Sequence, residues 1–179
     1  KNPEVGNKDV VRSKVFYLEQ ADAQCCNDGD EVTIMQWGNM FINKVEKDAE
    51  GKVTKMYATT NLEGDFKKTK YKLTWVGAKD GEQPEKDFVP LTLTEYGPLI
   101  TIEKLEEDQK VEDYVNHHSK EETFALGEHA LSALKHNDII QIQRKGFYRV
   151  DQEPCAENNN RFVLIYIPDG SQRKMLGIQ

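Results

Sequence analysis

The sequence predicts an all-β fold with short helices, in which the strands form two small β-barrels. Apolar and polar residues alternate over many short stretches that end at turn residues, which is the period of a strand with one buried face. Sustained helical periodicity is rare, and no strand-helix-strand rhythm indicates a parallel sheet. Residues 77–90 form a polar loop with two glycines and two prolines, the best internal boundary. A length of 179 residues suits two small barrels better than one large one.

In the first half of the chain, alternation with a period of two marks the expected strands. They cover residues 31–37, 40–45, 52–60 and 67–75. The second and third of these strands should form a hairpin, because residues 47–51 are typical of a turn. The fourth strand would place Lys68, Lys70 and Lys72 on one side of a sheet.

In the second half, strands again dominate, with two short helical segments between them. The expected strands cover residues 88–93, 99–102, 139–143, 147–150 and 162–167. Apolar residues at helical spacing predict one or two turns over residues 111–118, within an acidic stretch, and a second short helix over residues 130–135. The clearest hairpin turns at residues 144–146, with Gln141 and Gln143 on the face opposite Ile140 and Ile142.

Composition and charge exclude several classes of protein. The chain is 37% hydrophobic and 31% charged, with a formal net charge of -7, which on its face argues against a nucleic-acid binder. No apolar run approaches the ~18 residues of a membrane span, and residues 1–12 do not resemble a signal peptide, so we expect a soluble protein. Three cysteines without a C-x-x-C pattern indicate neither a disulfide framework nor a zinc site, and favour a cytosolic setting. The absence of an initiator Met suggests a fragment of something longer.

No catalytic or metal-binding set stands at a recognisable spacing. The chain has no phosphate loop, dinucleotide fingerprint or H-E-x-x-H helix. His117 and His118 are adjacent, so on a helix they would diverge by roughly 100° and not share a ligand sphere. His129 and His136 have no carboxylate or cysteine at ligand spacing, which favours surface or core histidines. We therefore expect no catalytic residues, no metal and no cofactor in this chain.

Two groups of basic and polar side chains remain as binding candidates. Lys67, Lys68, Lys70 and Lys72, with Tyr71 and Trp75 as stacking surfaces, would track a phosphate backbone, although lysines also protect an edge strand from aggregation. On the second-half hairpin, two glutamines leave the core beside a cationic turn. Amide and guanidinium groups at that spacing suit the edge of an unpaired base, so RNA binding is one interpretation.

Four segments carry a resemblance to a known family. Residues 2–6, 33–39, 138–147 and 164–170 are similar, in collinear order, to the C-terminal anticodon-binding region of eukaryotic cytosolic glutamyl-tRNA synthetases, including the glutamyl half of the bifunctional glutamyl-prolyl enzyme. Glutaminyl-tRNA synthetase shares the architecture. The resemblance therefore implies two β-barrels of the glutaminyl-tRNA synthetase anticodon-binding type.

The resemblance also implies how the chain is divided and what it binds. Residues 1–18 and 91–179 would form the first, proximal barrel, and residues 19–90 the second, distal barrel. The partner would be tRNA(Glu), and the setting the cytoplasm. The catalytic domain, which uses ATP and magnesium to activate glutamate, would lie upstream, because this chain has neither of the family's two catalytic motifs.

Three site residues follow from the glutaminyl relative. Gln141 and Arg144 occupy the Q-x-x-R hairpin that contacts the middle anticodon base, and Lys8 occupies the place of a supporting arginine. Where that relative has arginines for the neighbouring bases, this chain has Thr33 and Met35, so those contacts must differ.

Trp37 and Asn39 are the candidates for these other anticodon contacts by position and chemistry, as a stacking face and as a donor and acceptor. A core tryptophan and a turn asparagine are equally consistent with the pattern. Lys67, Lys68 and Lys70 complete the expected tRNA-binding set.

Two alternatives stay open at this point. The chain would also suit the corresponding region of glutaminyl-tRNA synthetase, or a module that docks onto other synthetases or scaffold proteins of a multi-synthetase complex through its acidic surface. The charge of -7 is compatible with tRNA binding if the acidic residues 103–113 face away from the RNA.

Overall fold

Strands make up nearly all the regular structure of the protein. The computed structural model describes residues 8–78 and 88–168. Its contacts divide the chain into two compact units, Lys1–Asp87 and Phe88–Gln179. The described helices are all short: α1 (Gln20–Gln24) and the 3₁₀ helices η3 (Val111–Tyr114), η4 (His129–Ala133) and η5 (Ala156–Asn158). The predicted all-β fold with short helices is confirmed.

The sheets in the described residues are open, which corrects the expectation of closed barrels. The first unit has a four-stranded sheet in the order β4-β3-β2-β5 and a two-stranded sheet β1-β6, and the second unit has a five-stranded sheet in the order β8-β7-β11-β10-β9. A barrel closes only when its first and last strands pair. Here β5 (Lys72–Leu73) has two residues and pairs only with β2, so the order ends at this strand.

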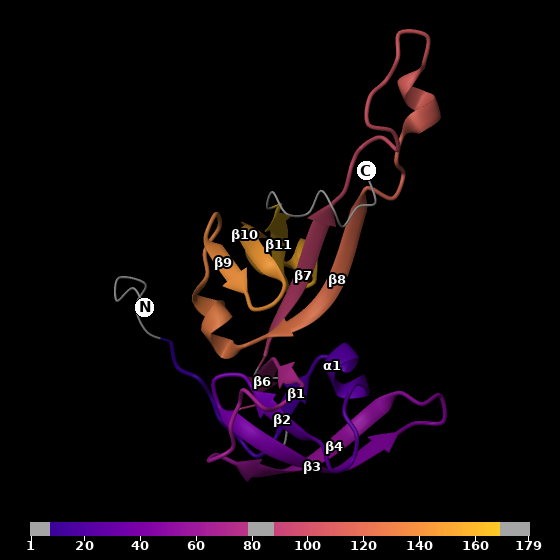
Figure 1. Cartoon of the computed structure of the whole chain (residues 1–179). Helices are drawn as coiled ribbons and strands as arrows, with labels where there is room; N and C mark the ends of the chain where they lie inside the picture. Colours follow the sequence, from indigo (N-terminus) through magenta and orange to yellow (C-terminus); the bar gives the residue numbers. More distant parts are fainter. Residues whose placement is uncertain (1–7, 79–87, 169–179) are drawn as a thin grey trace. The chain divides into compact units, whose positions relative to one another are not determined.

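The first unit is built around two hairpin connections (Figure 1). Its strands are β1 (Phe16–Leu18), β2 (Glu31–Ile34), β3 (Gly38–Lys47), β4 (Val53–Asn61), β5 (Lys72–Leu73) and β6 (Trp75–Gly77). Strands β2, β3 and β4 are antiparallel neighbours, and β5 pairs with β2 in parallel. The buried side chains of Val32, Ile34, Met40, Ile42 and Leu73 form its core with Cys26.

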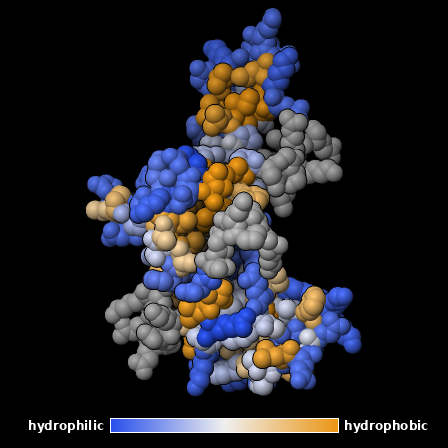
Figure 2. All heavy atoms as spheres, turned by 90° about the vertical axis from the view of Figure 1, so that its left-hand side faces the viewer, coloured by the Kyte–Doolittle hydropathy of each residue, from blue (hydrophilic) through white to orange (hydrophobic). Residues whose placement is uncertain are grey.

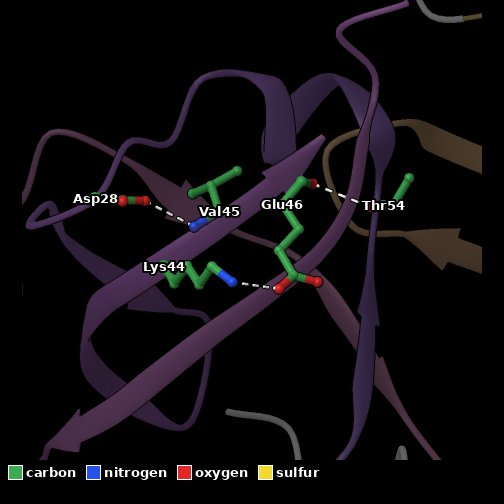
Figure 3. A network of polar contacts seen from close by, with 5 residues as sticks. All are labelled: Asp28, Lys44, Val45, Glu46 and Thr54. Carbon is green, nitrogen blue, oxygen red and sulfur yellow. Dashed lines mark hydrogen bonds and ion pairs between the residues drawn. The ribbon is translucent and has the colours of Figure 1, made fainter. Parts of the chain in front are cut away.

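A β-bulge in β3 is supported by the loop that follows α1. The register with β4 shifts between Ile42 and Lys44, which leaves one extra residue in β3. Beyond the bulge, the backbone N–H of Val45 donates to the Asp28 carboxylate at 2.7 Å (Figure 3). The same figure shows the ion pair between Lys44 and Glu46, 2.6 Å long. Asp28 thus satisfies a backbone donor of β3 just beyond the bulge.

The second unit packs its core on one face of the five-stranded sheet. Its strands are β7 (Val89–Tyr96), β8 (Lys120–Gly127), β9 (Ile139–Ile142), β10 (Gly146–Gln152) and β11 (Phe162–Ile167). Strands β7 and β11 are parallel, and the other neighbours are antiparallel. The buried core contains the residues Val89, Leu91, Leu93, Tyr148, Val150, Phe162, Leu164 and Tyr166. The opposite face of this sheet is called the outer face below.

Residues 97–119 connect β7 to β8 and differ from the prediction. The predicted strand over residues 99–102 is wrong, because this segment makes only an isolated bridge from Ile100 to Val115. The predicted helix over residues 111–118 is reduced to η3 (Val111–Tyr114). The segment, at the top of Figure 1, exposes Leu99 (74%), Val111 (51%) and Val115 (38%), and Figure 2 shows orange apolar atoms beside blue ones there. Apolar residues at helical spacing were misleading because they have no core to cover.

The lysine-rich strand predicted over residues 67–75 is also wrong in its first part. Lys67 and Lys68 lie in a turn, and only the short strands β5 and β6 form within this range. Lys68, Lys70 and Lys72 therefore do not line one side of a strand. Alternating lysines have the period of a strand, but apolar residues occupy the intervening positions only from Tyr71 onward, which is where the short strands form.

Strand β1 belongs to the first unit. Phe16, Tyr17 and Leu18 pair with Gly77, Val76 and Trp75 of β6. The sequence grouped residues 1–18 with residues 91–179, and that grouping stays a prediction. Within the described ranges, no helix is both long and apolar enough to cross a membrane.

Candidate nucleic-acid interface

The β9–β10 hairpin of the second unit holds the two residues of the Q-x-x-R motif. Lys145 N–H donates to the carbonyl of Ile142 at 3.0 Å, which closes the turn, and Arg144 takes the left-handed conformation with φ 67°. Gly146 follows with φ 127°, and a Cβ there would lie 2.7 Å from Tyr166 Cε2. The turn therefore needs glycine at position 146 and displays Arg144 at an exposed tip.

Gln141 leaves the core on the outer face of the sheet. The burial of β9 alternates between exposed and half-buried positions, and Ile140 and Ile142 pack against the core. Gln141 pairs with Phe147 of β10, and both are exposed. For Gln141 the prediction of a position opposite the two isoleucines is confirmed by this pattern, whereas Gln143, which is also exposed, lies in the turn beyond β9. The Gln141 amide offers one donor group and one acceptor to a ligand.

The β2–β3 hairpin of the first unit repeats this turn. Trp37 N–H donates to the carbonyl of Ile34 at 3.0 Å, Gln36 has φ 62°, and Gly38 has φ 149°. Arg12 Nη2 donates to the Gln36 carbonyl at 2.8 Å and so braces the tip. The equivalence of the two turns is not visible in the sequence, because residues 34–38 and 142–146 share only their first residue, Ile, and their last, Gly.

Trp37 lies in an aromatic cluster beside the β2–β3 turn. Its ring centroid is 5.4 Å from that of Phe16 and 4.7 Å from that of Trp75. Trp75 Nε1 donates to the Met35 carbonyl at 2.8 Å, which fixes the cluster against the turn. Trp37 is half-buried, so part of its ring surface packs on protein and part meets solvent.

Asn39 is buried within a polar network instead of being presented at the surface. It is 1% exposed, its Nδ2 donates to Glu31 Oε1 at 2.9 Å, and its Oδ1 accepts from Thr33 Oγ1 at 2.9 Å. Asn61 Nδ2 donates to the same Glu31 oxygen at 2.8 Å. Both ends of the Asn39 amide are thus engaged inside the protein. Direct contact between Asn39 and a base stays a prediction, and the engagement of both ends of the Asn39 amide inside the protein argues against it.

The same network reaches the lysine turn, which is defined as residues 66–70. Thr33 Oγ1 lies 2.6 Å from Thr69 Oγ1, which in turn is 3.0 Å from the carbonyl of Phe66. Thr33 and Thr69 are 7% and 5% exposed, so the turn is anchored from inside. Little in the sequence indicates this link between Thr33 and the lysine turn, since a threonine within an apolar strand is common.

The lysine turn holds its cations at the surface. Lys67 N–H donates to Asp65 Oδ1 at 2.9 Å, and Lys68 N–H donates to the Asp65 carbonyl at 3.0 Å. The Lys70 ammonium lies 4.8 Å from the Tyr71 ring centroid, and a hydrogen bond with Tyr71 raises the pKa of Lys70 above its ordinary value. Lys67, Lys68 and Lys70 are all exposed. Three exposed lysines therefore lie within four residues of one another on one anchored loop.

The eight predicted site residues fall into both units. Lys8, Trp37, Asn39 and the three lysines belong to the first unit, and Gln141 and Arg144 belong to the second. Lys8 is exposed at the beginning of the described chain. The network from Asn39 to Thr69 joins Asn39 with the lysine turn, a link between distant residues that the sequence did not reveal.

The described residues contain no group of three or more His, Cys, Asp or Glu side chains placed to hold a metal ion. His136 Nδ1 lies 2.9 Å from the carbonyl oxygen of Asp151, a backbone contact. Burial raises the pKa of the Cys26 thiol to about 11, so this group stays protonated at neutral pH.

Comparisons with known proteins match nearly the whole chain. The family described as "tRNA synthetases class I (E and Q), anti-codon binding domain" matches in two models, over residues 1–61 and 72–151. The cytoplasmic glutamate–tRNA ligase of Arabidopsis thaliana is 43% identical over 169 residues, covering 94% of this chain and 22% of the relative. That of Saccharomyces cerevisiae is 40% identical, covering 99% of this chain and 23% of the relative.

A bifunctional relative shows the same similarity. The bifunctional glutamate/proline–tRNA ligase of Mus musculus is 41% identical over 181 residues, covering 98% of this chain and 12% of the relative. The chain spans less than a quarter of the length of the two single-function ligases above. The hairpin with Gln141 and Arg144 lies inside the second matched range. The chain belongs to the anticodon-binding domain family of the class I tRNA synthetases for glutamate and glutamine.

Proposed function

We propose that this chain is the anticodon-binding region of a cytoplasmic glutamate–tRNA ligase and binds the anticodon loop of tRNA(Glu). The observation that carries the proposal is the match of both units to anticodon-binding models, with relatives named as glutamate–tRNA ligases over nearly the whole chain. Similarity to relatives of that name favours the glutamyl enzyme over the glutaminyl one.

Gln141 and Arg144 would read the middle anticodon base. Gln141 stands on a strand and Arg144 on the tight turn that follows, so their backbone positions are set by the hairpin. An amide and a guanidinium together offer several donors and one acceptor, which suits the polar edge of a base that is not paired. The hairpin would thus supply specificity.

The lysine turn and Lys8 would supply attraction to phosphates. Lys67, Lys68 and Lys70 are exposed and close in sequence, and the anchored loop reduces the freedom that binding would cost. Because such attraction depends on the local field, it is compatible with a net charge of -7. Trp37 would add a stacking surface beside the equivalent turn of the first unit.

Aminoacylation itself would take place in another part of the ligase. ATP and magnesium would act there, and the residues of this chain would orient the tRNA. Other synthetases would be partners if the parent enzyme resembles the bifunctional glutamate/proline–tRNA ligases in its assembly. Both statements rest on the family relationship.

The test uses the full-length ligase with Gln141→Ala and Arg144→Ala. Each should lower kcat/KM for tRNA(Glu), mainly by raising KM, because each removes a base-edge contact. The loss should correspond to about 1–3 kcal/mol of transition-state binding free energy. A transcript with A in place of U at the middle anticodon position should respond much less to either change. Lys104→Ala, which removes an exposed cation elsewhere in the second unit, is the matched control.

The lysines are tested by their salt dependence. Removing one phosphate-contacting lysine should reduce the slope of log K against log salt by about 0.7–0.9. Unchanged tRNA parameters in both hairpin variants would remove Gln141 and Arg144 from the interface, whatever the lysine variants do.

A further inference from the structure

A groove of about 320 Å³ lies on the outer face of the five-stranded sheet. Thr92 and Thr94 of β7 and Val163 and Ile165 of β11 line its floor, and they alternate with the core residues of the same strands. The connection from β10 to β11, with η5, forms one wall. Its volume is at the small end of ligand pockets.

The floor of the groove contains a buried hydroxyl without a partner. Thr94 is 1% exposed, and its Oγ1 has no hydrogen-bond partner among the described residues. Buried polar atoms are nearly always hydrogen-bonded, since an unmade bond is costly. The groove floor therefore contains a hydrogen-bonding group that the described residues leave unsatisfied.

The rim of the groove carries a stacking pair. Phe124 of β8 is 69% exposed, although it sits in a strand beside the buried Thr92. The guanidinium of Arg161 lies 4.7 Å from the Phe124 ring centroid, and its Nη1 donates to the Leu91 carbonyl at 3.4 Å. An aromatic ring and a held guanidinium plane are the two surfaces on which proteins stack unpaired bases.

The outer face also continues to the hairpin proposed for anticodon binding. Gln141 pairs with Phe147 and Phe147 with Ile167, so Gln141 and the exposed Phe147 share this face. In the next cross-strand row, Ile165 pairs with Thr94. Four strand spacings separate β9 from β8, roughly 19 Å in a flat sheet, which is a few nucleotides of an extended strand.

Charges near the groove favour a base over a phosphate. Lys120 pairs with Glu122 at 2.7 Å, and Arg149 with Asp151 at 3.1 Å, so these cations are already neutralised. Glu157 adds another carboxylate to the groove lining. The groove lining thus contains three carboxylates, Glu122, Asp151 and Glu157, against two cations, Lys120 and Arg161, so a phosphate would be repelled more than a neutral aromatic base.

We propose that this groove binds an unpaired nucleobase of the tRNA, outside the anticodon base read by Gln141. The base stacks on the face of the Phe124 ring that Arg161 leaves open, and its polar edge faces the Thr94 hydroxyl. The inference rests on the proposed function, because it requires that the hairpin on the same face bind tRNA. It adds a second RNA contact that determines affinity more than specificity.

The test measures tRNA(Glu) binding by the full-length ligase. Phe124→Ala should weaken binding about tenfold without changing its salt slope, because stacking is lost and no phosphate contact is. Leu126→Ala is the matched control, since Leu126 lies on the same strand, is 45% exposed and does not line the groove. Unchanged binding by Phe124→Ala, or an equal loss in Leu126→Ala, would overturn the proposal.

A crosslink identifies what occupies the groove. With Phe124→p-benzoylphenylalanine in the full-length ligase, irradiation in the presence of tRNA(Glu) should give an adduct to a nucleotide outside the middle anticodon position. An adduct to protein alone, or none to RNA, would refute the proposal. If Gln141→Ala still raises KM in that case, the anticodon function stands and only the groove is rejected. If neither residue affects tRNA binding, both proposals fail.

Discussion

Asn39→Ala should destabilise the first unit by disrupting its buried polar network. The change removes the donor to Glu31 and the acceptor for Thr33, each at 2.9 Å. It leaves a smaller side chain at a position that is 1% exposed. Glu31 would keep the bond from Asn61, but its carboxylate would have one donor fewer.

The expected loss follows from the two bonds. A hydrogen bond between neutral groups contributes about 1 kcal/mol, and one to a charged group about 1.5–3 kcal/mol. The free energy of unfolding should therefore fall by about 2.5–4 kcal/mol. Because the Thr33 hydroxyl also touches Thr69, the lysine turn should become less ordered.

Tryptophan fluorescence during urea unfolding measures this loss selectively. The chain has two tryptophans, and both Trp37 and Trp75 lie in the first unit, so the signal reports that unit alone. The midpoint should shift to lower urea with little change in slope. Asn43→Ala is the control in the same strand, because its amide makes a single exposed bond to Thr59 at 2.7 Å.

Equal midpoints for Asn39→Ala and Asn43→Ala would refute the reasoning. A second informative outcome is an unchanged midpoint together with weaker tRNA binding by the full-length ligase. That result would mean that Asn39 acts on the RNA directly, as the sequence position suggested, and not through the network.

Three other substitutions or treatments test the structure. Gly64→Ala should lower the free energy of unfolding by about 1–3 kcal/mol, since a Cβ there would lie 2.5 Å from Glu31 Oε1. An unchanged urea midpoint, measured by tryptophan fluorescence, would show that the added Cβ meets no such close contact. Gly146→Ala should also lower the free energy of unfolding by about 1–3 kcal/mol, because φ at this position is 127° and a Cβ would lie 2.7 Å from Tyr166 Cε2. Amide hydrogen exchange in the β9–β10 hairpin should become faster, and unchanged exchange would argue against a strained turn. At pH 8 iodoacetamide should modify the two exposed cysteines of the native protein but spare Cys26, because burial raises the pKa of the Cys26 thiol to about 11. Cys26 should react only after denaturation. Mass spectrometry counts the modified cysteines, and modification of all three in the native protein would disprove that protection.

Local pattern was a good guide wherever a strand has one buried and one exposed face. The hairpin around Arg144 was predicted nearly to the residue, because alternation, a polar turn and Gly146 all lie within ten residues. The pattern failed at residues 67–71, where alternating lysines mimic a strand, and strand β8 was not predicted because its first five positions are all exposed. In both places, neighbours distant in sequence decide the structure.

The sequence by itself determined the all-β class, the turn that presents Arg144 and the exposure of Gln141, because these depend on residues close along the chain. Only the tertiary structure decided that Asn39 is buried in a network with Thr33 and Thr69. It alone gathered Thr94, Phe124 and Arg161 around one groove, since these residues come from different strands and loops. The physical reason is that pairing between distant strands, and the packing that selects it, determine which polar groups meet.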